Sequence, residues 1–347
     1  MLQITETAVM DALRHVQEPE LGGDLVTRNM VRDLRIDGAK VAFQIELTTP
    51  ACPLKDEIES RVHAALDPLG VESVDLTWGA TVRRATPRTP EQLLPGVKNV
   101  LAIASGKGGV GKSTVAVNLA IALARGGLRA GLLDADIYGP SLPILLGMED
   151  GASRVRMSPE KHILPLDAFG VPMISFGFFL GEDSPAIWRG PMVSKAVKQF
   201  ARGVAWPELD VLVVDLPPGT GDIVLSLAQS VVLSGAIVVT QPPRVAVAEA
   251  RKAAQMFRTL EVPVLGVVEN MSGPFGRGAG RDVARDLAVP FLGEVPFDPA
   301  IVDEGDVGIP TLVARPHGAS ASAFDEIARA VAGALGWRHA DAVAREA

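Results

Sequence analysis

The first 83 residues combine the helical spacing of apolar positions with strand-like segments. Residues 5–16 have the spacing of a helix, and residues 54–66 form a second helical stretch. The pair Asp37-Gly38 predicts the turn of a hairpin. The strands expected in this part of the chain are residues 31–36, 40–47 and 71–78. Together these segments predict a small α+β domain over residues 1–83.

From residue 97 onward the pattern changes to short, fully apolar segments that alternate with helical ones. The expected strands are residues 100–104, 131–133, 211–214, 237–240, 264–268 and 290–292. Strands that are apolar on both faces are typical of a parallel sheet covered by helices on both sides. The predicted fold class is therefore α/β over residues 97–347, with a mostly parallel sheet. Residues 84–96, which hold three prolines, are expected to be a linker.

Composition narrows the classes of function. Hydrophobic residues make up 48% of the chain, enough for a sizeable core, and a formal net charge of -8 gives no electrostatic reason to expect nucleic acid or an anionic membrane as a partner. The single cysteine, Cys52, excludes an internal disulfide and fits a reducing compartment. The sequence has no signal peptide pattern and no apolar run of about 20 residues, so a cytoplasmic location is expected.

A glycine-rich segment follows the first of the apolar strands. It fits the pattern G-x-x-x-x-G-K-[ST], and its residues are Gly106, Lys107, Gly108, Gly109, Val110, Gly111, Lys112, Ser113 and Thr114. Glycines let backbone amides turn toward phosphate oxygens, and the helix that follows presents its positive end to the same anion. Lys112 is expected to reach the outer phosphates and Ser113 to ligate Mg²⁺. The segment predicts the phosphate loop of a P-loop NTPase.

Two other interpretations of this segment exist. A glycine-rich turn without any ligand needs the same glycines. The segment also satisfies G-x-G-x-x-G, and Asp134 lies about where a ribose-binding acid stands in dinucleotide-binding domains. A dinucleotide-binding domain, however, does not need Lys112-Ser113, and it leaves the acidic end of the strand at residues 211–214 unexplained.

Acidic residues follow two further strands. Asp134 and Asp136 lie two positions apart, where they can serve Mg²⁺ and a water beside a triphosphate. A polar strand end with helix-capping aspartates is the alternative. Asp215 ends another apolar strand and fits the Walker B role of holding Mg²⁺ through water. Gly219, which follows a Pro-Pro pair, can turn its amide toward a γ-phosphate, so this loop is predicted to distinguish ATP from ADP.

The motifs form a recognisable combination. They are residues 105–114, 134–141, 188–192, 215–222 and 269–272. This combination resembles the Mrp/ApbC family, ATP-dependent iron–sulfur cluster carriers with a deviant Walker A loop. The first domain resembles the small domain of iron–sulfur assembly factors, whose pattern includes Glu18-Pro19-Glu20 and residues 48–53. The resemblance covers nearly the whole chain and implies ATP and Mg²⁺ as cofactors.

The resemblance also implies roles for single residues. In that family the lysine matching Lys107 crosses a dimer interface and touches the partner's nucleotide, which implies a homodimer. Asp136 would orient the attacking water, and Asp134 would support the metal shell. The asparagine that matches Asn270 recognises adenine. The plain alternatives are a solvated lysine at 107 and a turn-forming asparagine at 270.

One departure from the family concerns cysteine. In these carriers Asn-Met-Ser is soon followed by a Cys-x-x-Cys pair, thought to bridge a [4Fe–4S] cluster between subunits, whereas no cysteine follows Ser272 here. Clusters are usually held by four thiolates, and a dimer of this chain offers two, both Cys52. Cys52 precedes a helix start, which lowers a thiol pKa, so it is a candidate ligand of a labile cluster shared with a partner's thiols. The alternative is a buried, inert side chain.

These observations predict an ATP-binding and ATP-hydrolysing iron–sulfur cluster carrier or assembly factor. Turnover is expected to be slow and Mg²⁺-dependent, with Lys107, Lys112 and Asp136 as the catalytic residues. Apo iron–sulfur proteins or other assembly factors are the expected partners, with no nucleic acid and no membrane. The alternative function is a regulatory or partitioning-type ATPase switch that acts through protein partners without a cluster, which the missing cysteine pair favours.

Overall fold

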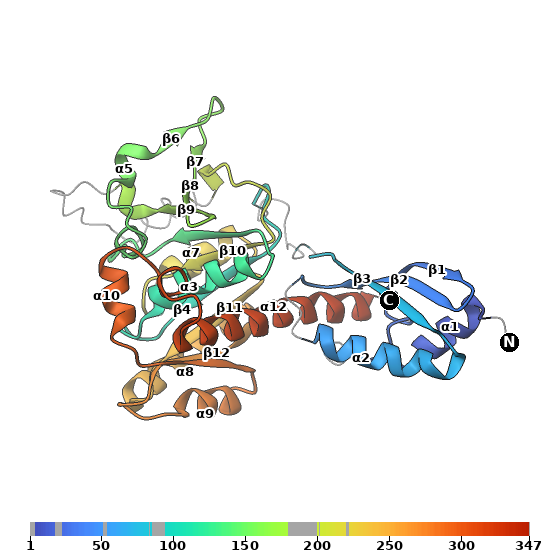
Figure 1. The fold of residues 1–347 in the computed structure, drawn as a ribbon. Coiled ribbons are helices and arrows are strands. Elements are labelled where there is room, and N and C mark those ends of the chain that lie inside the picture. The colour runs from blue at the N-terminus through green and yellow to red at the C-terminus, as the bar shows by residue number, and fades with distance from the viewer. Residues whose placement is uncertain are drawn as a thin grey trace. The chain divides into compact units, whose positions relative to one another are not determined.

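The computed structural model divides the chain into two compact units (Figure 1), residues 1–83 with 332–347, and residues 84–331. It describes residues 4–17, 23–50, 54–82, 84, 94–179, 200, 202–219 and 222–346, of which residue 222 and residues 337–346 by their backbone alone. The expectations that fall outside the described residues are those for Cys52, Glu18-Pro19-Glu20, residues 188–192 and most of the 84–96 linker.

The first unit is a three-stranded sheet with helices packed on one face. Its elements are α1 (Glu6–Leu13), β1 (Val31–Asp37), β2 (Lys40–Leu47), α2 (Lys55–Leu66), a 3₁₀ turn (Asp67–Leu69) and β3 (Ser73–Ala80), with strand order β1-β2-β3. β1 and β2 form the antiparallel hairpin expected around Asp37-Gly38, and β3 runs parallel to β2. Alternate side chains of β2, among them Phe43 and Ile45, enter the core with those of α1 and α2.

The second unit is built on an eight-stranded sheet in the order β13-β12-β11-β4-β10-β5-β9-β8. Seven of these strands are parallel: β4 (Val100–Ala104), β5 (Ala130–Asp134), β9 (Val171–Ser175), β10 (Val211–Asp215), β11 (Gly235–Thr240), β12 (Val264–Ser272) and β13 (Phe291–Pro296). The edge strand β8 (Leu166–Ala168) is antiparallel to β9. β6 (Arg156–Met157) and β7 (Ile163–Leu164) form a separate ribbon.

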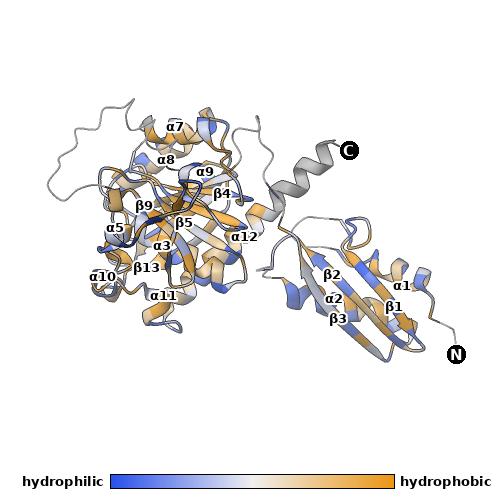
Figure 2. Cartoon of the chain, turned by 90° about the horizontal axis from the view of Figure 1, so that it is seen from above, coloured by the Kyte–Doolittle hydropathy of each residue, from blue (hydrophilic) through white to orange (hydrophobic). Residues whose placement is uncertain are grey.

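Helices cover both faces of this sheet, as Figure 2 shows with α7, α8 and α9 on one side and α3 and α11 on the other. The helices are α3 (Lys112–Arg125), α4 (Leu142–Leu145), α5 (Gly151–Arg154), a 3₁₀ turn (Phe176–Phe179), α7 (Asp222–Ser230), α8 (Arg244–Thr259), α9 (Ala279–Asp286), α10 (Ala300–Asp306), α11 (Thr311–Ala314) and α12 (Ala319–Glu346). Every residue of β4, β5, β10 and β11 is buried, because these strands are covered on both faces. The predicted fold class is confirmed.

The parallel strands bring their carboxyl ends to one edge of the sheet, where an α/β fold places its ligands. Asp215 at the end of β10 lies in register with Asp134 at the end of β5 and with Ile103 on β4. β12 continues to Ser272, beyond the predicted end at residue 268, so Asn270 lies within a strand. Among the described helices, none combines the length and the apolar character needed to cross a membrane.

At the amino ends of the parallel strands, one aspartate forms hydrogen bonds with residues that precede two neighbouring strands. The Asp210 carboxylate, just before β10, accepts hydrogen bonds from Lys98 Nζ (2.8 Å), which precedes β4, and from the Arg129 guanidinium (3.0 Å to Nη2), which precedes β5. The backbone N–H of Arg129 donates to the same carboxylate (3.0 Å). Burial opposes the charged form, but these hydrogen bonds outweigh it and lower the pKa of Asp210 to about 2.

Candidate nucleotide site

The glycine-rich segment forms a loop between β4 and α3, as the sequence predicts. Two of its glycines have a left-handed backbone, Gly109 at φ 80° and Gly111 at φ 79°, and Gly111 is the N-cap of α3. A Cβ on Gly111 would lie 2.1 Å from Asn270 Nδ2. A Cβ on Gly106 would lie 2.0 Å from the backbone oxygen of Glu249 on α8. The loop therefore needs glycine both for its backbone angles and for its close packing.

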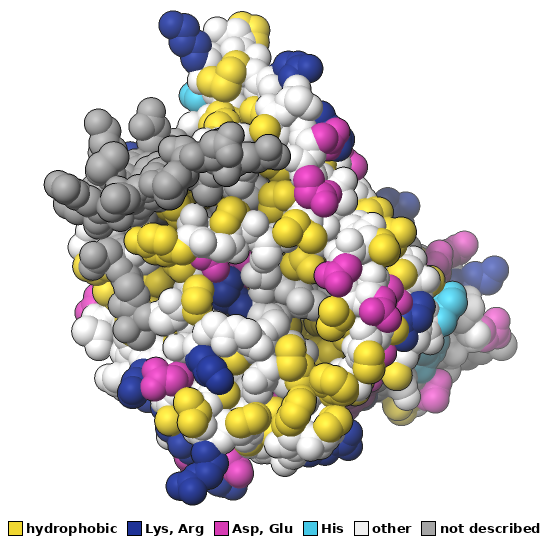
Figure 3. Space-filling model, turned by 90° about the vertical axis from the view of Figure 1, so that its left-hand side faces the viewer, with side chains coloured by type: hydrophobic (Ala, Val, Ile, Leu, Met, Phe, Trp, Pro, Cys, Tyr) yellow, Lys and Arg dark blue, Asp and Glu magenta, His cyan; other side chains and the backbone are white. Residues whose placement is uncertain are grey.

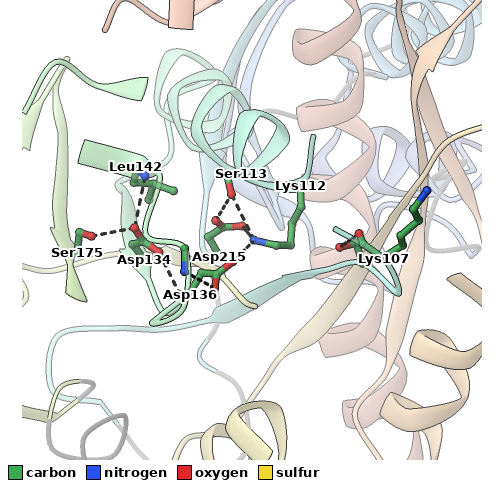
Figure 4. A network of polar contacts seen from close by, with 10 residues as sticks. Lys107, Lys112, Ser113, Asp134, Asp136, Leu142, Ser175 and Asp215 are labelled. Carbon is green, nitrogen blue, oxygen red and sulfur yellow. Dashed lines mark hydrogen bonds and ion pairs between the residues drawn. The ribbon is translucent and has the colours of Figure 1, made fainter. Parts of the chain in front are cut away.

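Lys112 and Ser113, the first residues of α3, both contact Asp215 (Figure 4). Lys112 Nζ lies 2.7 Å from Asp215 Oδ1 and 3.6 Å from Asp136 Oδ2, and Ser113 Oγ donates to Asp215 Oδ2 at 2.5 Å. Lys112 is only 6% exposed and Asp215 is fully buried. The phosphate loop, Asp136 and Asp215, which is 103 residues from Lys112 in sequence, thus form one charged network.

Asp134 is held by the protein itself on both of its oxygens. Its Oδ2 accepts from Ser175 Oγ (2.8 Å) at the end of β9 and from the backbone N–H of Leu142 (3.4 Å), while Oδ1 accepts from the backbone N–H of Asp136 (3.1 Å). Asp136 in turn accepts from the backbone N–H of Gly139 (3.3 Å). Asp134 therefore fixes the turn that carries Asp136, and Asp136 faces Lys112 (Figure 4).

The electrostatics of the network favour an added cation. Burial and the neighbouring Asp215 raise the pKa of Asp134 to about 7. Burial also raises the pKa of Asp215 and Asp136, against the lowering effect of the Lys112 ammonium. Three buried carboxyl groups thus share one buried ammonium, and a divalent ion bound here would offset that excess of negative charge.

The donor set fits Mg²⁺, which prefers hard oxygen ligands and keeps several waters. Ser113 supplies a hydroxyl oxygen and Asp215 a carboxylate beside it. Within the described part of the chain, no three His, Cys, Asp or Glu side chains gather closely enough to hold a metal ion by themselves. Phosphate oxygens and water would therefore have to complete the shell of a magnesium ion here.

The remaining predicted residues lie around this network. The exposed Lys107 side chain points away from Lys112 and the aspartates (Figure 4). The Gly219 amide, predicted to face a γ-phosphate, donates to the Ser105 carbonyl oxygen at 2.8 Å. Asn270 is 5% exposed, and its Nδ2 donates to the Val110 carbonyl oxygen at 2.9 Å.

Sequence reasoning missed two side chains that complete the site. Ser175 bonds Asp134, and Gln241 Nε2, just after β11, donates to the Gly109 carbonyl oxygen at 3.1 Å. Both stand at or next to the carboxyl end of a parallel strand, which is the position that singled out Asp134 and Asp215. The strand at residues 171–175 was not predicted, so the signal for Ser175 was missing. For Gln241 the signal was present, since its strand was predicted to end at residue 240.

A glycine loop between a buried parallel strand and a helix, with a lysine paired to the aspartate that ends the adjacent strand, defines a P-loop NTPase. Residues 96–332 match the model of the ParA family, described as NUBPL iron-transfer P-loop NTPase, and residues 6–76 match that of the iron–sulfur cluster assembly protein family. The chain belongs to the NUBPL-type iron-transfer P-loop NTPases.

Known relatives extend over almost the entire chain. The iron–sulfur cluster carrier protein of Synechocystis sp. is 46% identical over 344 residues, covering 95% of this chain and 98% of that protein. The chloroplast Fe–S cluster assembly factor HCF101 of Arabidopsis thaliana is 42% identical, and the match covers 94% of this chain and 63% of that protein. The resemblance to the Mrp/ApbC family is thereby confirmed.

Solved structures resemble the ATPase part. A nucleotide-binding protein of Archaeoglobus fulgidus, in complex with ADP, is 36% identical with a TM-score of 0.54, covering 61% of this chain and 87% of that one. The cell division ATPase MinD of Pyrococcus furiosus has a TM-score of 0.52 at 24% identity, covering 67% of this chain and 98% of that one. The MinD likeness establishes the shared fold.

Proposed function

We propose that this protein is an ATP-dependent iron–sulfur cluster carrier that delivers clusters to apo-proteins in the cytoplasm. The observation that supports it most directly is the Lys112–Asp215–Ser113 network, an assembled ATPase site, in a chain 46% identical to a cluster carrier over nearly its full length. The match of residues 6–76 to iron–sulfur assembly proteins points to the same process.

ATP hydrolysis at this site would rest on positioning and charge stabilisation. Bound Mg²⁺, held by Ser113 and through water by Asp215, would neutralise charge on the β- and γ-phosphate oxygens. Lys112 would leave its carboxylate partners for the phosphates, because a triphosphate carries more charge than they do. Asp136, freed from Lys112 and fixed by Asp134, would then orient the attacking water. We expect slow turnover, since switches of this type gate a partner.

The working form is proposed to be a homodimer closed by ATP. Lys107 supports this, because it is exposed and points out of its own site (Figure 4), as a residue that reaches a second subunit must. The formal net charge gives no electrostatic reason to expect nucleic acid as a partner. Among the described residues on the face drawn in Figure 3, basic and acidic side chains are interspersed among hydrophobic ones, and they form no broad basic area. This agrees with the net charge of -8.

The cluster is the cargo, and the number of cysteine ligands that the chain offers determines how it can be bound. The chain has one cysteine, so a dimer contributes at most two thiolates of the usual four. We propose that Cys52 ligates a labile cluster whose other ligands come from the donor or acceptor protein. The same shortage of thiolates favours one other candidate function, an ATPase switch that acts through protein partners and carries no cluster.

Anaerobic reconstitution separates these two candidates. The purified protein is incubated with iron and sulfide, desalted, and assayed for iron per dimer and for transfer to an apo-ferredoxin. A carrier binds iron and activates the acceptor, and Cys52→Ala reduces both. Absence of iron and of transfer in wild type as well as in Cys52→Ala would eliminate the carrier function while leaving the ATPase intact.

A further inference from the structure

Two side-chain amides hold successive carbonyl groups of the phosphate loop. Gln241 Nε2 donates to the Gly109 oxygen at 3.1 Å, and Asn270 Nδ2 donates to the Val110 oxygen at 2.9 Å. The donors come from different elements, one following β11 and the other lying on β12, which pair with each other in the sheet. Side chains from two other elements thus hold the loop by hydrogen bonds at two adjacent peptide groups.

Because of peptide geometry, hydrogen bonds to these two carbonyl groups also fix the direction of the N–H groups that follow them. In a planar trans peptide the C=O of one residue and the N–H of the next point in opposite directions. Holding the Gly109 oxygen outward therefore directs the Val110 N–H inward, and holding the Val110 oxygen does the same for the Gly111 N–H. Inward N–H groups of a glycine loop are what surrounds phosphate oxygens.

The two donors are themselves held in place. Asn270 is 5% exposed, and its Nδ2 packs so closely on the loop that a Cβ at Gly111 would overlap it. Its neighbour Glu269 is fully buried and accepts from the backbone N–H groups of Gly278 (3.0 Å) and Gly280 (2.6 Å) at the start of α9. Gln241 Nε2 also contacts Met271 Sδ. The end of β12 is therefore anchored on both sides of Asn270.

We propose that Gln241 and Asn270 are positioning residues that set the phosphate loop for the triphosphate before nucleotide binds. Their effect falls on the phosphates, whatever the base. The proposal rests on ATP binding at this loop, and it adds to Asn270 a function separate from contact with adenine. Losing either amide leaves a loop carbonyl unfastened and lets its peptide group rotate, so the adjoining N–H no longer faces the site.

A base-free ligand isolates this effect. Binding of Mg²⁺–tripolyphosphate and of Mg²⁺–ATP is measured by calorimetry for wild type, Gln241→Met and Asn270→Ala. Gln241→Met is expected to weaken both ligands by a similar factor, roughly fivefold to tenfold, which is what loss of one hydrogen bond produces. Asn270→Ala is expected to weaken tripolyphosphate by the same factor and ATP by at least as much, because it also removes the expected adenine contact. KM for ATP is expected to rise with kcat little changed, because ground state and transition state lose the same contact.

The control is Gln255→Met, the same chemical change at an exposed position of α8, which should leave both affinities and the melting temperature at wild-type values. Unchanged tripolyphosphate binding in both loop variants would overturn the proposal, even if ATP binding weakened, since the amides would then act on the base alone. Absence of ATP binding in wild type would instead refute the ATPase site itself.

Discussion

At the scale of single residues, the site is a balance of buried charge. Lys112 pairs with Asp215 at 2.7 Å and lies 3.6 Å from Asp136, so its ammonium stabilises two carboxylates that burial disfavours. In the structure these carboxylates pair with the lysine that is proposed to bind the outer phosphates of ATP. ATP binding is therefore expected to exchange one set of ion pairs for another, and Lys112 is expected to contribute to stability as well as to affinity.

Lys112→Ala is expected to abolish ATP binding and to lower the free energy of unfolding by about 3–5 kcal/mol, because removing one partner of a buried pair leaves an uncompensated charge. The double variant Lys112→Ala/Asp215→Asn should recover most of that stability and still not bind ATP. Chemical denaturation and nucleotide titration measure the two effects. Hydrolysis at the wild-type rate in Lys112→Ala would refute the assigned role.

Residue types at this site were predictable, while their partners were not. The motif and the strand ends identified Lys112, Ser113, Asp134, Asp136 and Asp215. That Lys112 lies against Asp215 depends on β4 and β10 being neighbours in the sheet, and strand order is not encoded in local spacing. The bond from Ser175 to Asp134 depends in the same way on β5 lying beside β9.

At the scale of elements, the phosphate loop carries the tightest constraints. Gly109 and Gly111 both have a left-handed backbone, but only Gly111 also meets a neighbour, with Asn270 Nδ2 at 2.1 Å from an added Cβ and nothing within 4 Å at Gly109. The two positions thus share the backbone requirement and differ in available space.

Gly111→Ala is therefore expected to weaken ATP binding strongly, at least tenfold more than Gly109→Ala, because the new methyl group displaces Asn270 from the loop. Both variants should lose about 1–2 kcal/mol of stability from the left-handed backbone alone. Nucleotide affinity and thermal unfolding of the pair measure the difference. Equal affinities in the two variants would mean that the Asn270 contact does not matter to the loop.

Asp210, at the amino ends of the parallel strands and away from the nucleotide site, provides a test of stability alone. Asp210 is ionised throughout the neutral range, because Arg129 and Lys98 lower its pKa to about 2. A lowered carboxyl pKa contributes stability above the unfolded value near 3.8, and this contribution is lost as the pH falls toward the folded value.

Asp210→Asn is expected to lower the free energy of unfolding by about 1–2 kcal/mol near neutral pH, a figure reduced for the solvent exposure of Arg129. The difference from wild type should shrink as the pH falls from about 4 to 2. Urea unfolding across that range measures it, with ATP binding as the control that stays unchanged. A difference independent of pH would contradict the ion-pair explanation.

Strand predictions succeeded where burial on both faces imposed long apolar runs, as in β4, β10 and β11. They failed over residues 156–175, whose strands are two to five residues long and include Pro172 and exposed positions. Short edge segments bury little apolar surface, so their sequences carry little periodic signal. β12 was predicted too short because Glu269 and Asn270 are polar, and both are buried by specific hydrogen bonds.

At the scale of the whole molecule, an assembled ATPase site stands in a chain with one cysteine. In the carrier proposed here, ATP hydrolysis is expected to control release of the cluster. We therefore expect nucleotide state and cluster transfer to be coupled, with hydrolysis as the step that reopens a closed dimer.

The most direct test is the rate of cluster transfer from reconstituted protein to an apo-ferredoxin, with and without Mg²⁺–ATP, in wild type and in Asp136→Asn. Asp136→Asn is expected to bind ATP but to hydrolyse it about 10²-fold more slowly, since it cannot orient the water as a base. The predicted result is a transfer rate that changes when Mg²⁺–ATP is added to wild type. In Asp136→Asn, added Mg²⁺–ATP is predicted to stop transfer. Transfer at the same rate in all four conditions would contradict the proposal that ATP drives this carrier.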